Sequence, residues 1–202
     1  MQQIFLTTLL LLFGVSVHAQ DALLKAQERA KYLGDYKALL EHEDGTIRLA
    51  AIEEALLSDD ALLRSMALET ALDSDDDRLQ MTAIRWYINE REQIPVTLTL
   101  PDRATDGQKY IYQTWSSLIL LKPEVTGQNE IQYRASYGAG GQLIRGGMEL
   151  RFNPGGGMGC TMTVKAAGAA TLLGQFFCNF GPSYSKRFGE EQAAIVARID
   201  LS

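Results

Sequence analysis

Histidine and cysteine carry much of the nucleophilic and metal chemistry of proteins, and this sequence has two of each. His18 lies in the apolar N-terminal segment, so that His42 is the histidine left for the rest of the chain. One histidine cannot form a multi-histidine metal site, and a triad could use only this residue beside an acidic cluster. We therefore expect His42 to be a solvated helix-end residue, and we expect no catalytic residue set, no metal site and no cofactor.

The two cysteines lie on strand-like runs that flank a turn at Gly168-Ala169-Ala170. If these runs pair antiparallel about Ala169, Cys160 faces Cys178, and alternate side chains form an apolar face. The sequence therefore predicts a disulfide between Cys160 and Cys178, which would contribute about 3 kcal/mol by closing the loop. A disulfide leaves no thiol for catalysis. The alternative is two buried free thiols.

A second turn, at residues 153–157, gives an independent register for the strand before Cys160. It pairs Phe152 with Cys160 and Leu150 with Met162, on the same face as the first hairpin. A slip of one residue would turn this whole set outward, so two agreeing registers support each other. We expect a three-stranded antiparallel meander closed by the disulfide.

Carboxylates are the other candidates for chemistry. Residues 73–77 resemble the start of a calcium loop, but Arg78 and Ile84 occupy the positions where an EF-hand needs Gly and Glu. A helix cap is the better interpretation of this cluster. A glycosidase-like carboxylate pair also remains open, although no spacing singles one out among the acidic residues after position 94: Asp102, Asp106, Glu124, Glu130, Glu149, Glu190, Glu191 and Asp200.

Two aromatic residues suggest a sugar-binding alternative. Tyr110 and Tyr112 would lie on one face of a strand predicted at residues 110–121 and could stack on a glycan. The same alternation places Trp115 on the opposite face. This favours a strand with one face in the core and the other on the surface over a shared sugar-binding platform.

The N-terminal segment has an apolar run from Ile4 to Val17, followed by Val17-His18-Ala19. This pattern is typical of a secretory signal, and it is too short for a membrane span. We expect residues 1–19 to be removed and the mature chain to be periplasmic or secreted. The alternative is a buried N-terminal helix.

Charge divides the chain into two parts. Residues 20–93 contain 17 acidic and 9 basic residues, a net charge of −8, whereas residues 94–202 have a net charge of +2. An acidic region repels the phosphate backbone, so nucleic acid is not an expected partner.

The acidic part contains a repeat with a period of 16 residues, at 47–52, 63–68 and 79–84. Each copy has an apolar residue, Arg or Gln, two free positions, Ala and another apolar residue, and a polar cluster precedes it. Short polar side chains accept hydrogen bonds from the free amides of a helix N-terminus. The pattern predicts one short helix per unit, with another helix over residues 21–36 that stops at Gly34.

On this Asp-rich turn followed by Arg and Ala, residues 41–92 resemble HEAT or armadillo-like helical repeats. The resemblance implies a surface that binds other proteins.

From Ile94 onward the sequence predicts an edge strand containing Pro95, then strands near residues 110–121, 130–137, 143–152, 159–165, 171–180 and 194–201. Residues 138–141 are predicted to form a hairpin turn. The predicted fold class is α+β, with a repeat-like helical region followed by an antiparallel sandwich or small barrel. The expected domains are the signal at 1–19, the helical region at 20–93 and the β domain at 94–202.

Our functional hypothesis is a non-enzymatic protein-binding module of the cell envelope, such as an inhibitor or immunity-type protein. Its partner would be another envelope or secreted protein, including a basic one, bound through Asp59, Asp60, Asp75 and Asp76. The alternatives are glycan binding or hydrolysis by the β domain, and a structural envelope component.

Overall fold

The computed structural model describes the backbone of residues 2–201 and the side chains of residues 20–201. The side chains of the predicted signal segment, residues 1–19, lie outside the described residues. The chain forms two compact units, Met1–Ala51 and Ile52–Ser202, and each is described by itself. The domain boundary between residues 93 and 94 stays a prediction.

In the first unit, α1 (Gln2–Leu40) leads through a short turn into α2 (Gly45–Leu57), whose last residues, 52–57, belong to the second unit. The predicted helix over residues 21–36 is confirmed, but it does not stop at Gly34. Gly34 lies in open space within the helix, and a single glycine costs a helix only about 1 kcal/mol relative to alanine. The hydroxyl of Tyr36 donates a hydrogen bond to the Ala51 carbonyl of α2. Among the helices of the described residues, none combines the length and the apolar composition that a membrane span requires.

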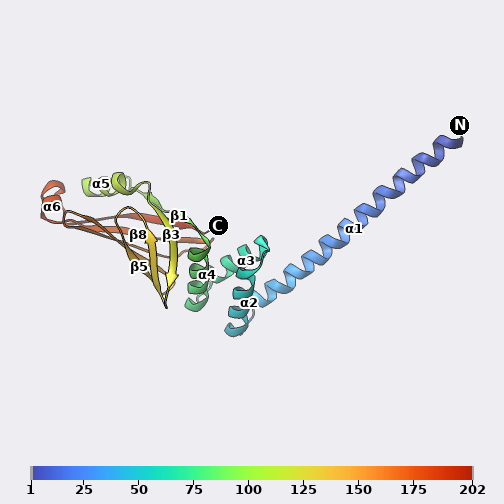
Figure 1. Ribbon diagram of the computed structural model, residues 1–202, viewed down its shortest axis with the longest axis horizontal. Coiled ribbons are helices and arrows are strands. Elements are labelled where there is room, and N and C mark those ends of the chain that lie inside the picture. The colour runs from blue at the N-terminus through green and yellow to red at the C-terminus, as the bar shows by residue number, and fades with distance from the viewer. Residues whose placement is uncertain (1, 202) are drawn as a thin grey trace. The chain divides into compact units, whose positions relative to one another are not determined.

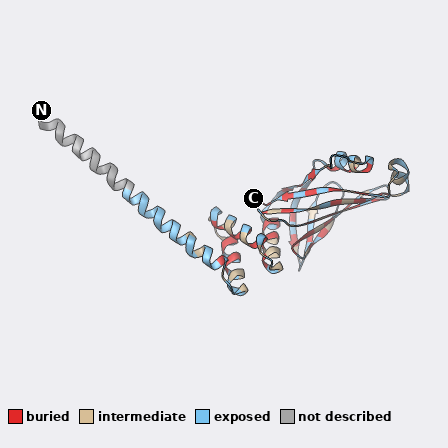
Figure 2. Ribbon diagram, turned by 180° about the vertical axis from the view of Figure 1, so that it is seen from behind, coloured by how far each residue is buried: buried red, intermediate tan, exposed pale blue. Residues whose placement is uncertain are grey.

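Helices α2, α3 (Ala61–Asp73) and α4 (Asp77–Glu90) begin 16 residues apart, as the repeat predicts. The alanine and the apolar residue that end each repeat motif are buried, at Ala67 and Leu68 in α3 and at Ala83 and Ile84 in α4. Figure 2 shows that each of these helices carries buried as well as exposed positions. The small alanine allows close helix packing, because little side-chain volume separates the two backbones.

All nine strands of the described residues belong to one sheet, in the order β1-β3-β4-β5-β6-β7-β8-β9-β2. The strands are β1 (Gln93–Pro95), β2 (Thr97–Thr99), β3 (Ile119–Thr126), β4 (Glu130–Arg134), β5 (Gly138–Ile144), β6 (Gly147–Gly155), β7 (Met158–Ala166), β8 (Thr171–Asn179) and β9 (Gln192–Asp200).

The segment of residues 93–99 brings the two edges of the sheet together. Its first half, β1, pairs with β3, and its second half, β2, pairs with β9. Between them, Val96 donates to the Leu118 carbonyl at 3.0 Å. The sheet therefore nearly closes as a small antiparallel barrel, and the predicted α+β fold class is confirmed. Pro95 lies on an edge strand, where its missing N–H is tolerated.

Both predicted hairpin registers are confirmed. Cys160 pairs with Cys178 across β7 and β8, and Phe152 pairs with Cys160 across β6 and β7. Cys160 and Cys178 form the predicted disulfide, and both are buried.

The strand predicted at residues 110–121 is wrong in its first half. Residues Asp106–Trp115 form a helix, α5, and β3 begins only at Ile119. A capping box starts α5: Thr105 accepts from the Gln108 backbone, and the Gln108 side chain accepts from the Thr105 N–H. Ile111 and Trp115 are buried together because they lie one helical turn apart.

The turn predicted at residues 138–141 is also wrong, because these residues begin strand β5 and the turn after β4 lies at residues 135–137. The strand predicted at residues 143–152 is interrupted by a second turn at Arg145-Gly146. Gly141 allows β5 and β6 to approach closely, because an added Cβ would lie 2.4 Å from the Glu149 carbonyl oxygen. A further helix, α6 (Pro182–Phe188), precedes β9.

Within the second unit, α4 packs against one end of the sheet, and α6 lies at the opposite end (Figure 1). The Tyr87 hydroxyl donates to the Asp200 carbonyl at 2.9 Å, and the Asn89 side chain accepts from Val125 N–H at 2.8 Å. Inside the sheet, Trp115 packs against Phe152 and Phe176.

Candidate functional site

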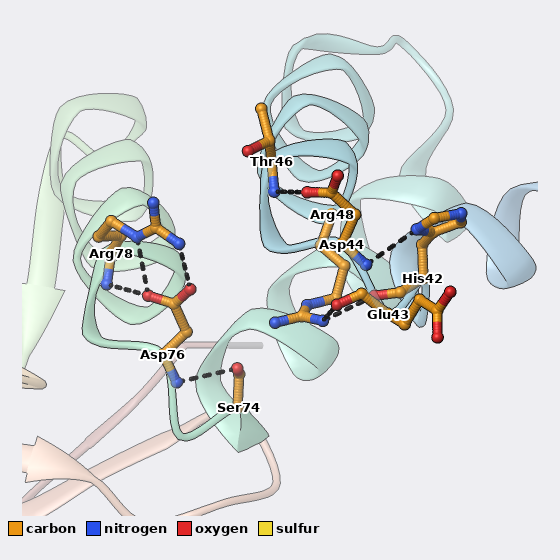
Figure 3. A network of polar contacts seen from close by, with 8 residues as sticks. All are labelled: His42, Glu43, Asp44, Thr46, Arg48, Ser74, Asp76 and Arg78. Atoms are coloured by element: carbon orange, nitrogen blue, oxygen red, sulfur yellow. Dashed lines mark hydrogen bonds and ion pairs between the residues drawn. The ribbon is translucent and has the colours of Figure 1, made fainter.

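Two of the four aspartates predicted to bind a protein partner cap helices. Asp60 accepts from the N–H groups of Leu62 and Leu63 at the start of α3, and Asp76 accepts from Arg78 N–H at the start of α4. Figure 3 shows the Asp76 cap, with the Arg78 guanidinium also on the same carboxylate at 2.7 Å. Hydrogen bonding to Asp76 raises the pKa of Arg78. These carboxylates satisfy helix amides that would otherwise lack acceptors.

The repeated Arg or Gln has the same role in each unit. Arg64 donates to the Ser58 carbonyl at 2.6 Å, and Gln80 donates to the Ser74 carbonyl at 2.7 Å. In the first repeat, Arg48 donates to the carbonyl of His42 at 2.6 Å (Figure 3). Each side chain thus reaches back six residues to a carbonyl in the preceding turn. The repeat therefore encodes its own helix-to-helix turn.

His42 lies in the turn before α2, where its Nδ1 accepts from Asp44 N–H at 3.0 Å. Asp44 in turn accepts from the backbone N–H of Thr46, and this hydrogen bond lowers the pKa of the Asp44 carboxyl. Ser58 and Ser74 occupy the position of His42 in the next two units and accept from Asp60 and Asp76. His42 therefore makes the same kind of contact as a repeat serine.

Asp59 and Asp75 differ from the capping residues beside them. Both are exposed, and both directly precede a capping aspartate at the same position of successive repeats. Of the four predicted residues, these two present carboxylates to solvent without a capping role.

A cavity of about 400 Å³ lies on the helical part of the second unit, beside Asp59. A neighbouring cavity of about 260 Å³ shares Arg64, Trp86 and Arg91 with it. We call the two together the Trp86 groove. It is lined by Leu56, Leu57, Ser58, Asp59, Ala61, Arg64, Ser65, Leu68, Glu69, Trp86, Glu90, Arg91, Ala170 and Leu201.

The two arginine side chains near Trp86 each have an interaction partner. The hydrogen bond to Ser58 fixes Arg64, and the Arg91 guanidinium lies 4.9 Å from the centre of the Tyr87 ring. Burial raises the pKa of the Tyr87 hydroxyl, so the ring under Arg91 stays neutral at ordinary pH. Leu57, at the rim, is 75% exposed. Tryptophan and arginine in a concave site are the residues that most often dominate protein–protein affinity.

The sequence did not point to this groove, because Trp86 lies seven residues after Leu79 and helical periodicity therefore predicts a buried position for it. Trp86 is half-buried, while Ala83 and Tyr87 occupy the buried stripe. A signal was present, since Arg64 belongs to the repeat motif and lies on the same side of the helices.

The structure does not bring the two candidate tyrosines together. Tyr110 lies in an aromatic cluster with Tyr184 and Phe188, at ring-centre distances of 5.5 and 5.1 Å. Its hydrogen bond with the Tyr184 hydroxyl raises the pKa of Tyr110. Tyr112 is 36% exposed, and residues two apart on a helix point to different sides.

Of the β-domain carboxylates, Glu190 has the most specific role. It accepts from Gly107 N–H at 2.7 Å and from the Thr105 hydroxyl at 3.1 Å, so it anchors the start of α5. Asp200 forms an ion pair with Arg198. Within residues 20–201, no group of three His, Cys, Asp or Glu side chains is placed to hold a metal ion.

A third cavity, of about 580 Å³, lies between the end of α5, the start of β3 and the turn after β4. We call it the Trp115 pocket. Its lining residues are Thr114, Trp115, Ser117, Leu118, Ile119, Leu121, Arg134, Ala135 and Ser136. Sequence reasoning did not anticipate it, because it depends on α5 being a helix.

No protein-family model, no curated protein and no solved structure matches this chain.

Proposed function

We propose that this protein is a non-catalytic binding module that docks another protein of the cell envelope through the Trp86 groove. The observation that carries the proposal is that Trp86, Arg64 and Arg91 line the same concave surface. Such a site lets a partner bury one apolar side chain against the indole while water is excluded around it. An inhibitor or immunity-type role is the form of this function that we favour.

The rim of the groove suggests the chemistry of the partner. Asp59, Glu69 and Glu90 line it against two arginines, and Arg64 already donates to Ser58. Exposed Asp75 adds to the negative charge of residues 20–93, whose net charge is −8. A partner segment with an apolar anchor beside Lys or Arg would complement this surface, and long-range attraction would speed its association.

The HEAT-like interpretation of residues 41–92 is part of this proposal. One helix per 16 residues, a capping aspartate before each of α3 and α4, and the Arg or Gln that reaches back to the preceding turn support a repeated unit. Stacked helical units present their shared side as a binding surface.

Export is likewise proposed, and the disulfide supports it because disulfides persist in oxidising compartments. N-terminal sequencing of the protein from its own cells is expected to begin at Gln20. A chain that retains residues 1–19 in a reducing compartment would contradict export.

The experiment is affinity capture with residues 20–202 as bait in an envelope extract, followed by mass spectrometry. Baits carrying Trp86→Ala or the pair Asp59→Lys and Asp75→Lys are run beside the wild type. Tyr112→Ala and Glu130→Lys are matched controls, since both alter exposed residues outside the groove.

We expect one protein to be retained near stoichiometrically by the wild type and the controls and to be lost with Trp86→Ala. The charge-reversed bait should retain less of it at low salt, and the difference should shrink at high salt. If the Trp86→Ala bait retains the partner as well as the wild type does, this would contradict the groove as the docking site. Retention on polysaccharide, lost on changing Tyr110 and Tyr112, would favour the glycan alternative. Self-association at micromolar concentration would favour the structural one.

A further inference from the structure

We propose that the Trp115 pocket is a separate binding site for a small anionic amphiphile, a molecule with an apolar chain and one carboxylate. The site lies in the β part of the chain and does not depend on the Trp86 groove. Its volume of about 580 Å³ falls within the range of about 300–1,000 Å³ typical of small-molecule sites.

The first observation is an unsatisfied donor. Trp115 is 2% exposed, and its Nε1 is buried with no hydrogen-bond partner among the described residues. A buried indole N–H normally has an acceptor, and leaving it without one costs about 1–3 kcal/mol. Trp115 is one of the residues that line the pocket. An oxygen atom of a ligand would supply the missing acceptor.

The second observation is an unpaired cation. Arg134 lines the pocket, and within residues 20–201 its side chain makes no ion pair or hydrogen bond. No carboxylate side chain of the described residues lines the pocket. A guanidinium offers two parallel N–H donors that match a carboxylate, so this site favours an anion and disfavours a cation.

The third observation is the apolar surface that would take the chain of the ligand. Leu118 is buried, while Ile119 and Leu121 are each 40% exposed at the start of β3. Leu121 pairs with Arg134 across β3 and β4, which places apolar and charged groups side by side. The hydroxyls of Thr114, Ser117 and Ser136 complete the polar part of the lining. An apolar body with a charged end fits this combination better than a uniformly polar molecule.

The backbone beside the pocket departs from regular strand geometry. The pairing of β3 with β4 shifts register after Leu121, and Lys122 and Tyr137 have positive φ angles of 46° and 62°. Such conformations cost about 1–3 kcal/mol for residues other than glycine and concentrate at ligand sites. The ring of Tyr137 lies edge-on to Trp115 at 5.6 Å. The irregular segment therefore borders the unsatisfied indole.

The test uses sodium laurate below its micelle concentration, with dodecyltrimethylammonium as the cation of equal chain length. Binding to the mature chain is measured by calorimetry and by the fluorescence of Trp115 in a Trp86→Phe background. Arg134→Gln removes the proposed anchor, and Arg151→Gln is the control, an exposed arginine outside the pocket. Trp115→Phe removes the N–H and keeps an aromatic ring.

We expect one laurate per chain, a changed Trp115 emission, and binding of the cation that is at least tenfold weaker. Arg134→Gln and Trp115→Phe should each weaken laurate binding about tenfold, the effect of one lost charge-assisted hydrogen bond, whereas Arg151→Gln should have no effect. Equal binding of laurate and the cation, or unchanged affinity in Arg134→Gln, would overturn the proposal. Absence of laurate binding to the folded wild type would overturn it as well. Because Arg134 is exposed, its variant keeps the test valid if Trp115→Phe does not fold.

Discussion

The guanidinium of Arg64 donates a hydrogen bond of 2.6 Å to the backbone carbonyl of Ser58, six residues earlier. The same side chain lines the groove beside Trp86. One residue of the repeat motif thus closes the turn between two helices and forms part of the proposed docking surface. Gln80 makes the equivalent bond to Ser74 in the next unit.

Replacing Arg64 separates these two roles. Arg64→Met should lower the free energy of unfolding by about 1–2 kcal/mol, because a charge-assisted hydrogen bond to a turn carbonyl is lost. Arg64→Gln should cost less, since Gln80 already makes this contact in the next repeat. Urea unfolding measures both, with a shifted midpoint and an unchanged slope. Equal losses in the two variants would show that the hydrogen bond is not what stabilises the turn.

The aspartates before α3 should differ in their effect on stability. Asp60→Ala should cost about 1 kcal/mol because it removes the side chain that accepts from Leu62 and Leu63. Asp59→Ala should change stability by less than about 0.5 kcal/mol, since an exposed residue is altered. Thermal unfolding of the two variants compares neighbouring positions directly. A larger loss for Asp59→Ala would contradict the assignment of Asp60 as the cap.

The disulfide should stabilise the sheet strongly. Cys160 and Cys178 are 18 residues apart in sequence, and the chain-entropy model gives about 3 kcal/mol for a loop of this length. The double variant Cys160→Ala and Cys178→Ala should lose most of this amount in denaturant unfolding. Adding a reductant should weaken the wild type and leave the double variant unchanged. If adding reductant to the unfolded wild-type protein leaves its measured stability unchanged, the result would argue against the disulfide.

Tyr133 should make the folded state sensitive to alkali. Burial raises the pKa of its hydroxyl to about 12, and the hydroxyl donates to the Arg151 carbonyl at 2.6 Å. In the unfolded chain the pKa is about 10, so the unfolded state loses its proton first as the pH rises. The contribution of Tyr133 is therefore complete below about pH 10 and is lost between about pH 10 and 12. Stability measured over this range should fall less steeply in Tyr133→Phe, and identical slopes would contradict the assignment.

The hairpin registers could be derived from the sequence because turn residues and an alternating apolar face constrain the same strands. Phe152, Met162 and Phe176 must all lie on the buried face, and no shift by one residue satisfies this. The helix starts were equally accessible, since the polar caps recur with the period of the apolar positions.

The first half of the segment at 110–121 was assigned to a strand because its aromatic residues alternate with polar ones. Helix α5 forms instead, and buried Ile111 and Trp115 are one turn apart. The sequence did contain a helix signal: Thr105 and Gln108 have the spacing of a capping box. Pro182 and Gly189 similarly bracket α6 as residues typical of a helix start and end.

The Trp86 groove and the Trp115 pocket could not be predicted from the sequence because each joins segments far apart in the chain. The Trp86 groove includes Ala170 and Leu201 beside residues of the helices. The Trp115 pocket unites the end of α5 with Arg134, which pairs across the sheet with Leu121. Such neighbours follow from the packing of the helices against the sheet, which no local pattern encodes.

The most direct test of the docking surface is calorimetric titration of the captured partner against the wild type, Trp86→Ala and Tyr112→Ala. We expect Trp86→Ala to weaken binding by about 2 kcal/mol or more, at least about 30-fold, as for a residue at the centre of an interface. Tyr112→Ala should bind like the wild type. Affinity for Trp86→Ala within twofold of the wild type, with the variant folded, would contradict the Trp86 groove as the site of binding.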